Sequence, residues 1–124
     1  MASADFTRSL DRVREIDIMV TGRKSKRRIT VPVWFARDAD SLYLLPVSGS
    51  DTQWYRNVRK DPAIEMRAGR ARASAEVRPL TRRRDVEHVI ELFRARYGAG
   101  DVKRYYRKLN VALAVTLTNR ASAV

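Results

Sequence analysis

The chain has 124 residues and no cysteine, which suits one domain around a single core and excludes disulfides, thiolate metal sites and cysteine nucleophiles. Its 26 lysines and arginines against 14 aspartates and glutamates give a formal charge of +12, so we expect an anionic partner such as a nucleic acid, a phosphorylated cofactor or an acidic membrane. No apolar run approaches the roughly 18 residues of a membrane span, and we therefore expect a cytoplasmic protein without a membrane partner.

The first half of the chain alternates short apolar segments with turns. Its periodicity predicts, in chain order, a helix over 5–15, strands over 16–21, 28–37 and 42–47, and a helix over 52–60. The first helix could lie over a sheet as a lid. Asp61-Pro62 ends the last helix, since the residue before a proline disfavours helical geometry.

The second half predicts strands over 63–68, 71–79 and 111–117 and helices over 81–97 and 101–109. The helix over 81–97 carries the clearest apolar stripe, formed by Val86, Val89, Ile90, Phe93 and Tyr97. Six strands at short spacing with three or four helices do not alternate as a parallel doubly wound sheet does. We predict a mainly β fold over residues 1–124, an antiparallel barrel of about six strands with peripheral helices.

The turn between the first two strands holds the densest positive charge. Arg23, Lys24, Lys26, Arg27 and Arg28 surround Ser25 within a few residues. Such a run is often a solvated loop; it could also cradle a phosphate, because arginine offers forked donors, lysine a point charge and serine a short hydrogen bond. Three such bonds of roughly 1.5–3 kcal/mol each would supply much of the roughly 8 kcal/mol of micromolar affinity.

Pro32 lies inside the second predicted strand and has no amide to donate. It is therefore expected at a sheet edge, at a bulge or between two splayed strands. Splayed strands would leave a slot for a flat conjugated ring, with Trp34 beside it. An edge proline next to a core tryptophan explains the same residues.

Two further segments are candidates for ligand contacts. Ser48-Gly49-Ser50 precedes the helix over 52–60 and is similar to a small-residue anion loop, although an ordinary loop has the same composition. Tyr105 and Tyr106 stand among cations and could stack on a planar ligand or on bases, or simply accompany a solvated helix face. No nucleic-acid motif accompanies them, which argues against a nucleic-acid partner.

Side chains for acid–base or nucleophilic chemistry are sparse. The glutamates form no pair at a useful spacing, no Gly-x-Ser-x-Gly motif occurs, and His88 is the one histidine, so we predict no metal site. If the protein is an enzyme, a cofactor performs the bond chemistry and the chain supplies orientation and electrostatics.

The order of these segments resembles the deazaflavin-dependent nitroreductase family, a branch of the split β-barrel, flavin-binding superfamily whose other branches use FMN or pyridoxine phosphate. The resemblance covers roughly residues 16–69 and rests on Thr21-Gly22-Arg23-Lys24-Ser25, Val31-Pro32-Val33-Trp34-Phe35, Leu42-Tyr43-Leu44, Ser48-Gly49, Trp54-Tyr55-Arg56-Asn57-Val58 and Asp61-Pro62. Lys26 stands where that family usually has a glycine.

The resemblance implies a split β-barrel that holds reduced coenzyme F-420 and passes a hydride to a nitroaromatic, a quinone or another activated unsaturated acceptor. It also implies cofactor-binding roles for Arg23, Lys24, Ser25, Pro32, Val33, Trp34, Ser48, Gly49, Trp54 and Asn57, and a substrate-facing role for Tyr105 or Tyr106. Arg28 would replace a cofactor-binding arginine of the family if a bulge turned it to the other face of its strand. FMN in the same fold, or a basic nucleic-acid-binding module, are the alternatives. The same resemblance is compatible with a homodimer or a monomer.

Overall fold

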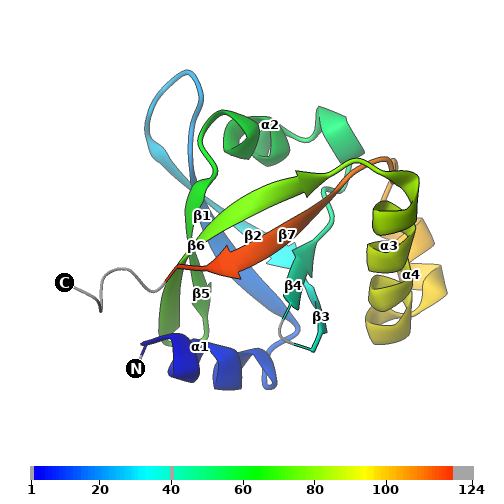
Figure 1. Ribbon diagram of the computed structural model, residues 1–124, viewed down its shortest axis with the longest axis horizontal. Coiled ribbons are helices and arrows are strands. Elements are labelled where there is room, and N and C mark those ends of the chain that lie inside the picture. Colours follow the sequence, from blue (N-terminus) through cyan, green and yellow to red (C-terminus); the bar gives the residue numbers. More distant parts are fainter. Residues whose placement is uncertain (1, 40, 119–124) are drawn as a thin grey trace.

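The computed structural model describes residues 2–39 and 41–118. Its elements are, in chain order, α1 (Ala2–Leu10), β1 (Glu15–Thr21), β2 (Arg28–Trp34), β3 (Ala36–Asp38), β4 (Ser41–Leu44), the 3-10 turn η1 (Gly49–Asp51), α2 (Gln53–Lys60), β5 (Ala63–Ala68), β6 (Ala71–Leu80), α3 (Arg83–Tyr97), α4 (Ala99–Tyr105) and β7 (Ala112–Leu117) (Figure 1). All seven strands belong to one antiparallel sheet in the order β2-β1-β5-β6-β7-β4-β3. The sheet curls into a half-barrel with helices around it.

The two edges of this sheet are consecutive in the chain. The strand that we predicted over 28–37 breaks at Phe35 into β2 and β3, which lie at opposite edges, so the sheet has seven strands rather than about six. The Phe35 side chain is fully buried in the barrel, and its main-chain N–H and C=O lie 3.2 and 3.0 Å from the Tyr97 hydroxyl rather than in a strand ladder. A tertiary contact therefore divides what the local pattern predicts as one strand.

The inner core fills the half-barrel. Along β1, the alternation predicted from the sequence directs Ile16, Ile18 and Val20 inward, where each is at most 1% exposed. From α1, Phe6 and Leu10 join this core, and α1 lies across the lower end of β5 and β6, opposite α2 (Figure 1).

Two predicted helices have different bounds. The first was predicted over 5–15 but ends at Leu10, because residues 11 and 12 form a turn in which their amides donate to Arg8 and Ser9. The one predicted over 101–109 covers Ala99–Tyr105, because the chain beyond it turns back to the segment after β4: the Arg107 amide donates to the Val47 carbonyl at 2.8 Å.

A second core lies between the outer face of the sheet and the helices α3 and α4. The predicted stripe of α3, which comprises Val86, Val89, Ile90, Phe93 and Tyr97, is buried against Ala36, Leu45, Leu80 and Ala112. Gly98 ends α3 with φ of 94° and ψ of 141°; the positive φ favours glycine, but the pair of angles lies outside the left-handed helical region of the common C-terminal cap. Among the described residues, no helix has both the length and the apolar character needed to span a membrane.

Candidate functional site

An apolar cavity of about 400 Å³ opens in the split between β2 and the chain that follows β4; we call it the split cavity. Ten of the described residues line it, and none of these is charged: Val31, Pro32, Val33, Trp34, Leu45, Val47, Thr52, Trp54, Tyr105 and Tyr106. A concave apolar wall with a few polar groups and a volume of roughly 300–1,000 Å³ is typical of small-molecule sites. The structure thus brings six of the predicted site residues together here: Pro32, Val33, Trp34, Trp54, Tyr105 and Tyr106.

Trp34 forms one wall of the split cavity and is held by aromatic neighbours. Its ring stacks on Tyr97, with centroids 4.1 Å apart and planes 11° apart, and the Tyr105 ring meets it edge-on at 5.7 Å. The Tyr97 hydroxyl also contacts the main chain of the next residue, Phe35. Ring and backbone contacts from one side chain therefore fix Trp34 beside the break between β2 and β3.

Pro32 lies on the edge strand β2, as predicted from its missing amide. The Gly22 amide donates to the Arg27 carbonyl at 2.8 Å, and pairing continues without a bulge from there to Glu15 opposite Trp34. Hydrogen-bonded and non-hydrogen-bonded pairs alternate along an antiparallel ladder, so Pro32 and its partner Asp17 form a pair that exchanges no hydrogen bonds. The proline therefore removes no hydrogen bond between β1 and β2. The missing amide lies on the free edge of β2, which borders the split cavity.

The polar side-chain groups of the described lining are the hydroxyls of Thr52, Tyr105 and Tyr106 and the indole N–H groups of the two tryptophans. Tyr106 is buried, and burial together with its neighbour Tyr97 raises the pKa of its hydroxyl well above the usual range. No described residue hydrogen-bonds to this hydroxyl, so it is a protonated donor available to a ligand. The Thr52 hydroxyl accepts a hydrogen bond from the Ser48 amide at 2.8 Å, which leaves its own proton to donate.

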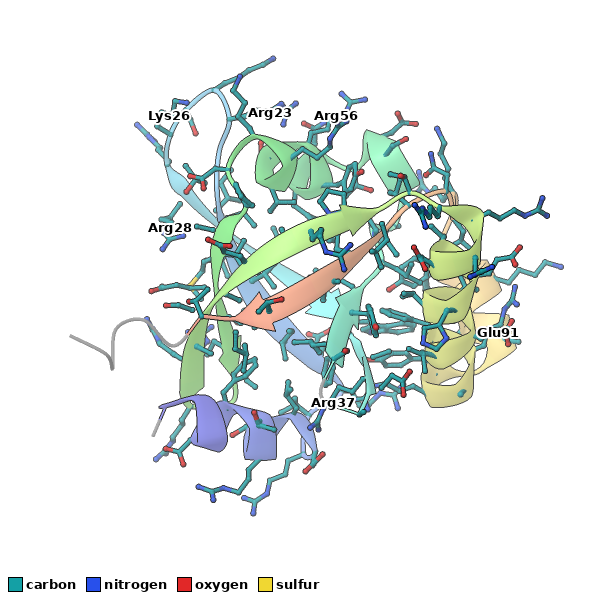
Figure 2. The ribbon with its side chains drawn as sticks, viewed as in Figure 1. Arg23, Lys26, Arg28, Arg37, Arg56 and Glu91 are labelled. Atoms are coloured by element: carbon teal, nitrogen blue, oxygen red, sulfur yellow. The ribbon has the colours of Figure 1, made fainter. Side chains whose placement is uncertain are left out.

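The basic loop, residues 22–27, is fastened to α2 by Arg23. The Asn57 side-chain oxygen accepts from both the amide and the guanidinium of Arg23, at 3.1 and 2.8 Å, and Gln53 accepts from the same guanidinium at 2.9 Å. Asn57 is only 5% exposed and is a polar residue within the core. The donors of Arg23 are therefore engaged by residues of α2, beside Thr52 and Trp54. Lys24 and Ser25 of the same loop are exposed. Arg23, Lys26 and Arg56 lie at the α2 end of the molecule (Figure 2).

Ser48 and Gly49 form a tight turn under the N-terminus of α2. Gly49 has φ of 56°, and a Cβ there would come within 2.1 Å of the Asn110 side-chain oxygen, so only glycine fits. Asn110 holds the turn from the other side, since it accepts from the Ser50 amide at 3.0 Å and donates to the Ser50 hydroxyl at 2.9 Å. The amides of Ser48 and Gly49 are used within this turn, which positions Thr52 rather than lining the split cavity.

Arg28 lies apart from the split cavity. Its guanidinium donates to the Met19 carbonyl at 3.3 Å and pairs with Glu65 at 3.7 Å, near β5 (Figure 2). The bulge that would have turned it to the other face is absent from the uninterrupted β1–β2 register. The structure therefore does not place Arg28 with the other predicted site residues, and the described residues of α1 do not line the split cavity either.

Several residues of the site were not predicted from the sequence. Leu45, Val47 and Thr52 enter the lining because the chain after β4 faces β2 across the split, which no local pattern shows. Tyr97 was predicted as the last residue of an apolar stripe, but no sequence pattern indicated that its hydroxyl contacts the main chain of Phe35. Asn110 follows α4 without any recognisable motif.

A family profile described as "Uncharacterized protein conserved in bacteria (DUF2255)" matches residues 7–118 of this chain. None of the curated protein sequences is significantly similar to it.

Solved structures show the same fold at low sequence identity. An F420-H2-dependent reductase, FDR-A, is 20% identical with a TM-score of 0.65 over 83% of this chain and 94% of its own. A protein described as a domain-swapped dimer is 18% identical with a TM-score of 0.66 over 92% and 99%. A candidate pyridoxamine 5'-phosphate oxidase from Listeria innocua is 11% identical with a TM-score of 0.66 over 94% of each chain. These similarities confirm the predicted split β-barrel fold.

Proposed function

The chain belongs to the DUF2255 family, and on that premise we propose that it is a deazaflavin-dependent oxidoreductase that uses reduced coenzyme F-420 to reduce a nitroaromatic, a quinone or another activated unsaturated acceptor. The observation that carries this proposal is the uncharged, aromatic split cavity, whose rim at the first turn of α2 is joined to the basic loop by the hydrogen bonds from Arg23 to Gln53. A flat conjugated ring with an acidic tail matches an apolar cavity beside a cationic loop.

The residues present fit such a cofactor. The lining of the split cavity carries no charge that a tricyclic ring would have to desolvate, and burying a ring there removes its apolar surface from water. The exposed cations Lys24 and Lys26 lie on the loop that Arg23 fastens beside the cavity, so they are the proposed contacts of the phosphate and acidic tail. Arg23 would act as a positioning residue for this loop.

The chain's own contribution to turnover is orientation. When bound, the reduced deazaflavin supplies a hydride, and the apolar walls would keep water away from it. Trp34, fixed by Tyr97, would pack against the ring and set its depth in the split. Tyr106 would donate a hydrogen bond but would not act as a base, because its raised pKa keeps it protonated at neutral pH. Tyr105, which is 49% exposed, would face the acceptor at the cavity mouth.

The two tryptophans of the chain make a direct binding test possible, because both line the split cavity. Titration with F-420 is expected to quench most of the tryptophan emission with a dissociation constant of tens of micromolar or less. Tyr105→Ala should weaken binding about tenfold, since one lost aromatic contact is worth roughly 1–3 kcal/mol. Tyr43→Ala, a matched change at a tyrosine outside the cavity, should leave binding unchanged.

FMN is the competing ligand, because one similar structure is a candidate pyridoxamine 5'-phosphate oxidase. The same titration with FMN decides between the two: quenching by FMN alone, or a yellow purified protein, would replace the deazaflavin with a flavin in the same cavity. Absence of quenching by both cofactors would reject the proposed function. With F-420 bound, loss of the reduced cofactor's absorbance after addition of a nitroaromatic or a quinone would identify the acceptor class.

A further inference from the structure

A second cavity, of about 320 Å³, lies on the outer face of the sheet, between the first half of α3 and the strands β4 and β6. Tyr43, Arg78, Leu80, Arg84, Asp85 and His88 line it, and it shares no lining residue with the split cavity. We call it the outer cavity. The buried stripe of α3 and its partners on the sheet form the core between the two cavities.

The strand register explains why there is room here. Arg78 of β6 and Tyr43 of β4 are both paired with Ala114 of the intervening strand β7, so the three residues form one row across the sheet. With neighbouring strands about 4.8 Å apart, Arg78 and Tyr43 stand about 10 Å from each other. The small Ala114 side chain leaves the space between them open beneath α3.

Two guanidinium groups of the outer cavity are unused. Among the residues that the structure describes, neither Arg78 nor Arg84 has a hydrogen-bond or ion-pair partner, and Asp85 forms no ion pair with them although it lines the same cavity. Other arginines of α3 behave differently: Arg83 pairs with Glu87 at 3.1 Å, and Arg94 pairs with Glu91. The cations that face the outer cavity thus keep donors available for a ligand.

His88 lines the outer cavity beside these two guanidinium groups and is held in place from a fourth element. Its Nε2 lies 3.0 Å from a carboxylate oxygen of Asp38 on β3, and its ring meets the Tyr43 ring edge-on at 6.0 Å. Asp38 thereby fixes the ring orientation and leaves Nδ1 without a partner among the described residues. The charged and titratable groups around His88 are Asp38, Tyr43, Arg78, Arg84 and Asp85.

We propose that the outer cavity is a binding site for a small oxyanion, a phosphate or carboxylate group held by Arg78 and Arg84 next to His88. Guanidinium groups bind such anions through paired hydrogen bonds, and two of them facing one cavity offer more donors than a single carboxylate such as Asp85 satisfies. The Tyr43 hydroxyl, which also lacks a described partner, is a further donor. This site is independent of the proposed redox function.

His88 is the one histidine of the chain, so its ring protons give a single reporter for this site in proton NMR. Titration with inorganic phosphate at constant pH and ionic strength should shift these signals saturably, because a bound anion changes the electrostatic environment of the imidazole ring. Arg84→Gln should weaken the phosphate affinity at least tenfold. Arg82→Gln removes the same charge two residues earlier, outside the cavity, and should change the affinity less than twofold.

Two further experiments compare phosphate with a carboxylate and test the site with a variant on a second element. Acetate in place of phosphate shows whether the site prefers a carboxylate. Arg78→Gln, on another element, should weaken phosphate binding as Arg84→Gln does, with the far-ultraviolet circular dichroism of both variants checked for an unchanged fold. A His88 signal that does not saturate with either anion, or equal losses in Arg82→Gln and Arg84→Gln, would overturn the proposal, since both would indicate diffuse attraction to a basic surface.

Discussion

The split cavity and the basic loop are neighbours along α2, but they are held by different forces. Rings that pack on one another hold the cavity wall, with Trp34 against Tyr97, whereas one buried amide, Asn57, holds the loop through Arg23. Packing spreads over many weak contacts, while the amide concentrates the support in two hydrogen bonds. The position of the basic loop therefore depends more on one side chain, Asn57, than the position of the cavity wall depends on any single contact.

The largest expected effect of a single substitution is at that amide. Asn57→Ala removes the acceptor of the Arg23 amide and one acceptor of its guanidinium, which keeps Gln53, and it should lower the free energy of unfolding by about 2 kcal/mol. Urea unfolding measures this change. Gln53→Ala removes the exposed contact of the same guanidinium and should cost about 0.5 kcal/mol. Equal losses of unfolding free energy in the two variants would show that Asn57 contributes no more to holding the basic loop than Gln53 does.

The matching test on the cavity side is Tyr97→Phe, which keeps the ring that stacks on Trp34 and removes the hydroxyl. The Phe35 amide then loses its acceptor, so we expect the free energy of unfolding to fall by about 1.5 kcal/mol, while the near-ultraviolet dichroism of Trp34 stays largely unchanged. Tyr43→Phe is the control, because its hydroxyl has no partner among the described residues, and its expected cost is under about 0.5 kcal/mol. A large dichroism change in Tyr97→Phe would mean that the hydroxyl, and not the stacking, holds the wall.

The smallest effect should be a gain. Lys26 adopts a φ of 63°, in the left-handed region that favours glycine, so Lys26→Gly should raise the free energy of unfolding by about 1 kcal/mol. Lys24→Gly removes the same charge at a position without a positive φ, and it should be slightly destabilising. Thermal unfolding of the two variants at one ionic strength compares them. A gain in both would assign the effect to charge rather than to backbone strain.

The sequence predicted what depends on local periodicity. The strand alternation of β1, the stripe of α3 and the edge position of Pro32 follow from side-chain spacing and from the missing amide. The break at Phe35 does not, because it depends on a hydroxyl 62 residues later in the chain. Barrel closure likewise brings Leu45 and Val47 to face β2, so only the half of the split cavity on β2, α2 and α4 was visible in advance.

Arg23 and Arg28 show the same limit for charged residues. Composition predicts that the turn is cationic, but it does not show which cation is already occupied, and Arg23 proves to be engaged with Asn57. The position of Arg28 depends on whether the β1–β2 ladder has a bulge, which is a property of the pairing of two strands and not of either one.

The one-residue link at Phe35 has a consequence for how this scaffold could change its ligand. The two edge strands of the sheet, β2 and β3, are joined by Phe35 alone, so the distance from Trp34 to Ala36 is limited to two extended residue steps, about 7 Å. An insertion next to Phe35 would widen the opening directly, whereas an equal insertion in the loop at residues 22–27 would lengthen only an exposed turn. We therefore expect chain length at this one position to affect the size of the ligand that the split cavity admits, without replacement of any side chain that lines it.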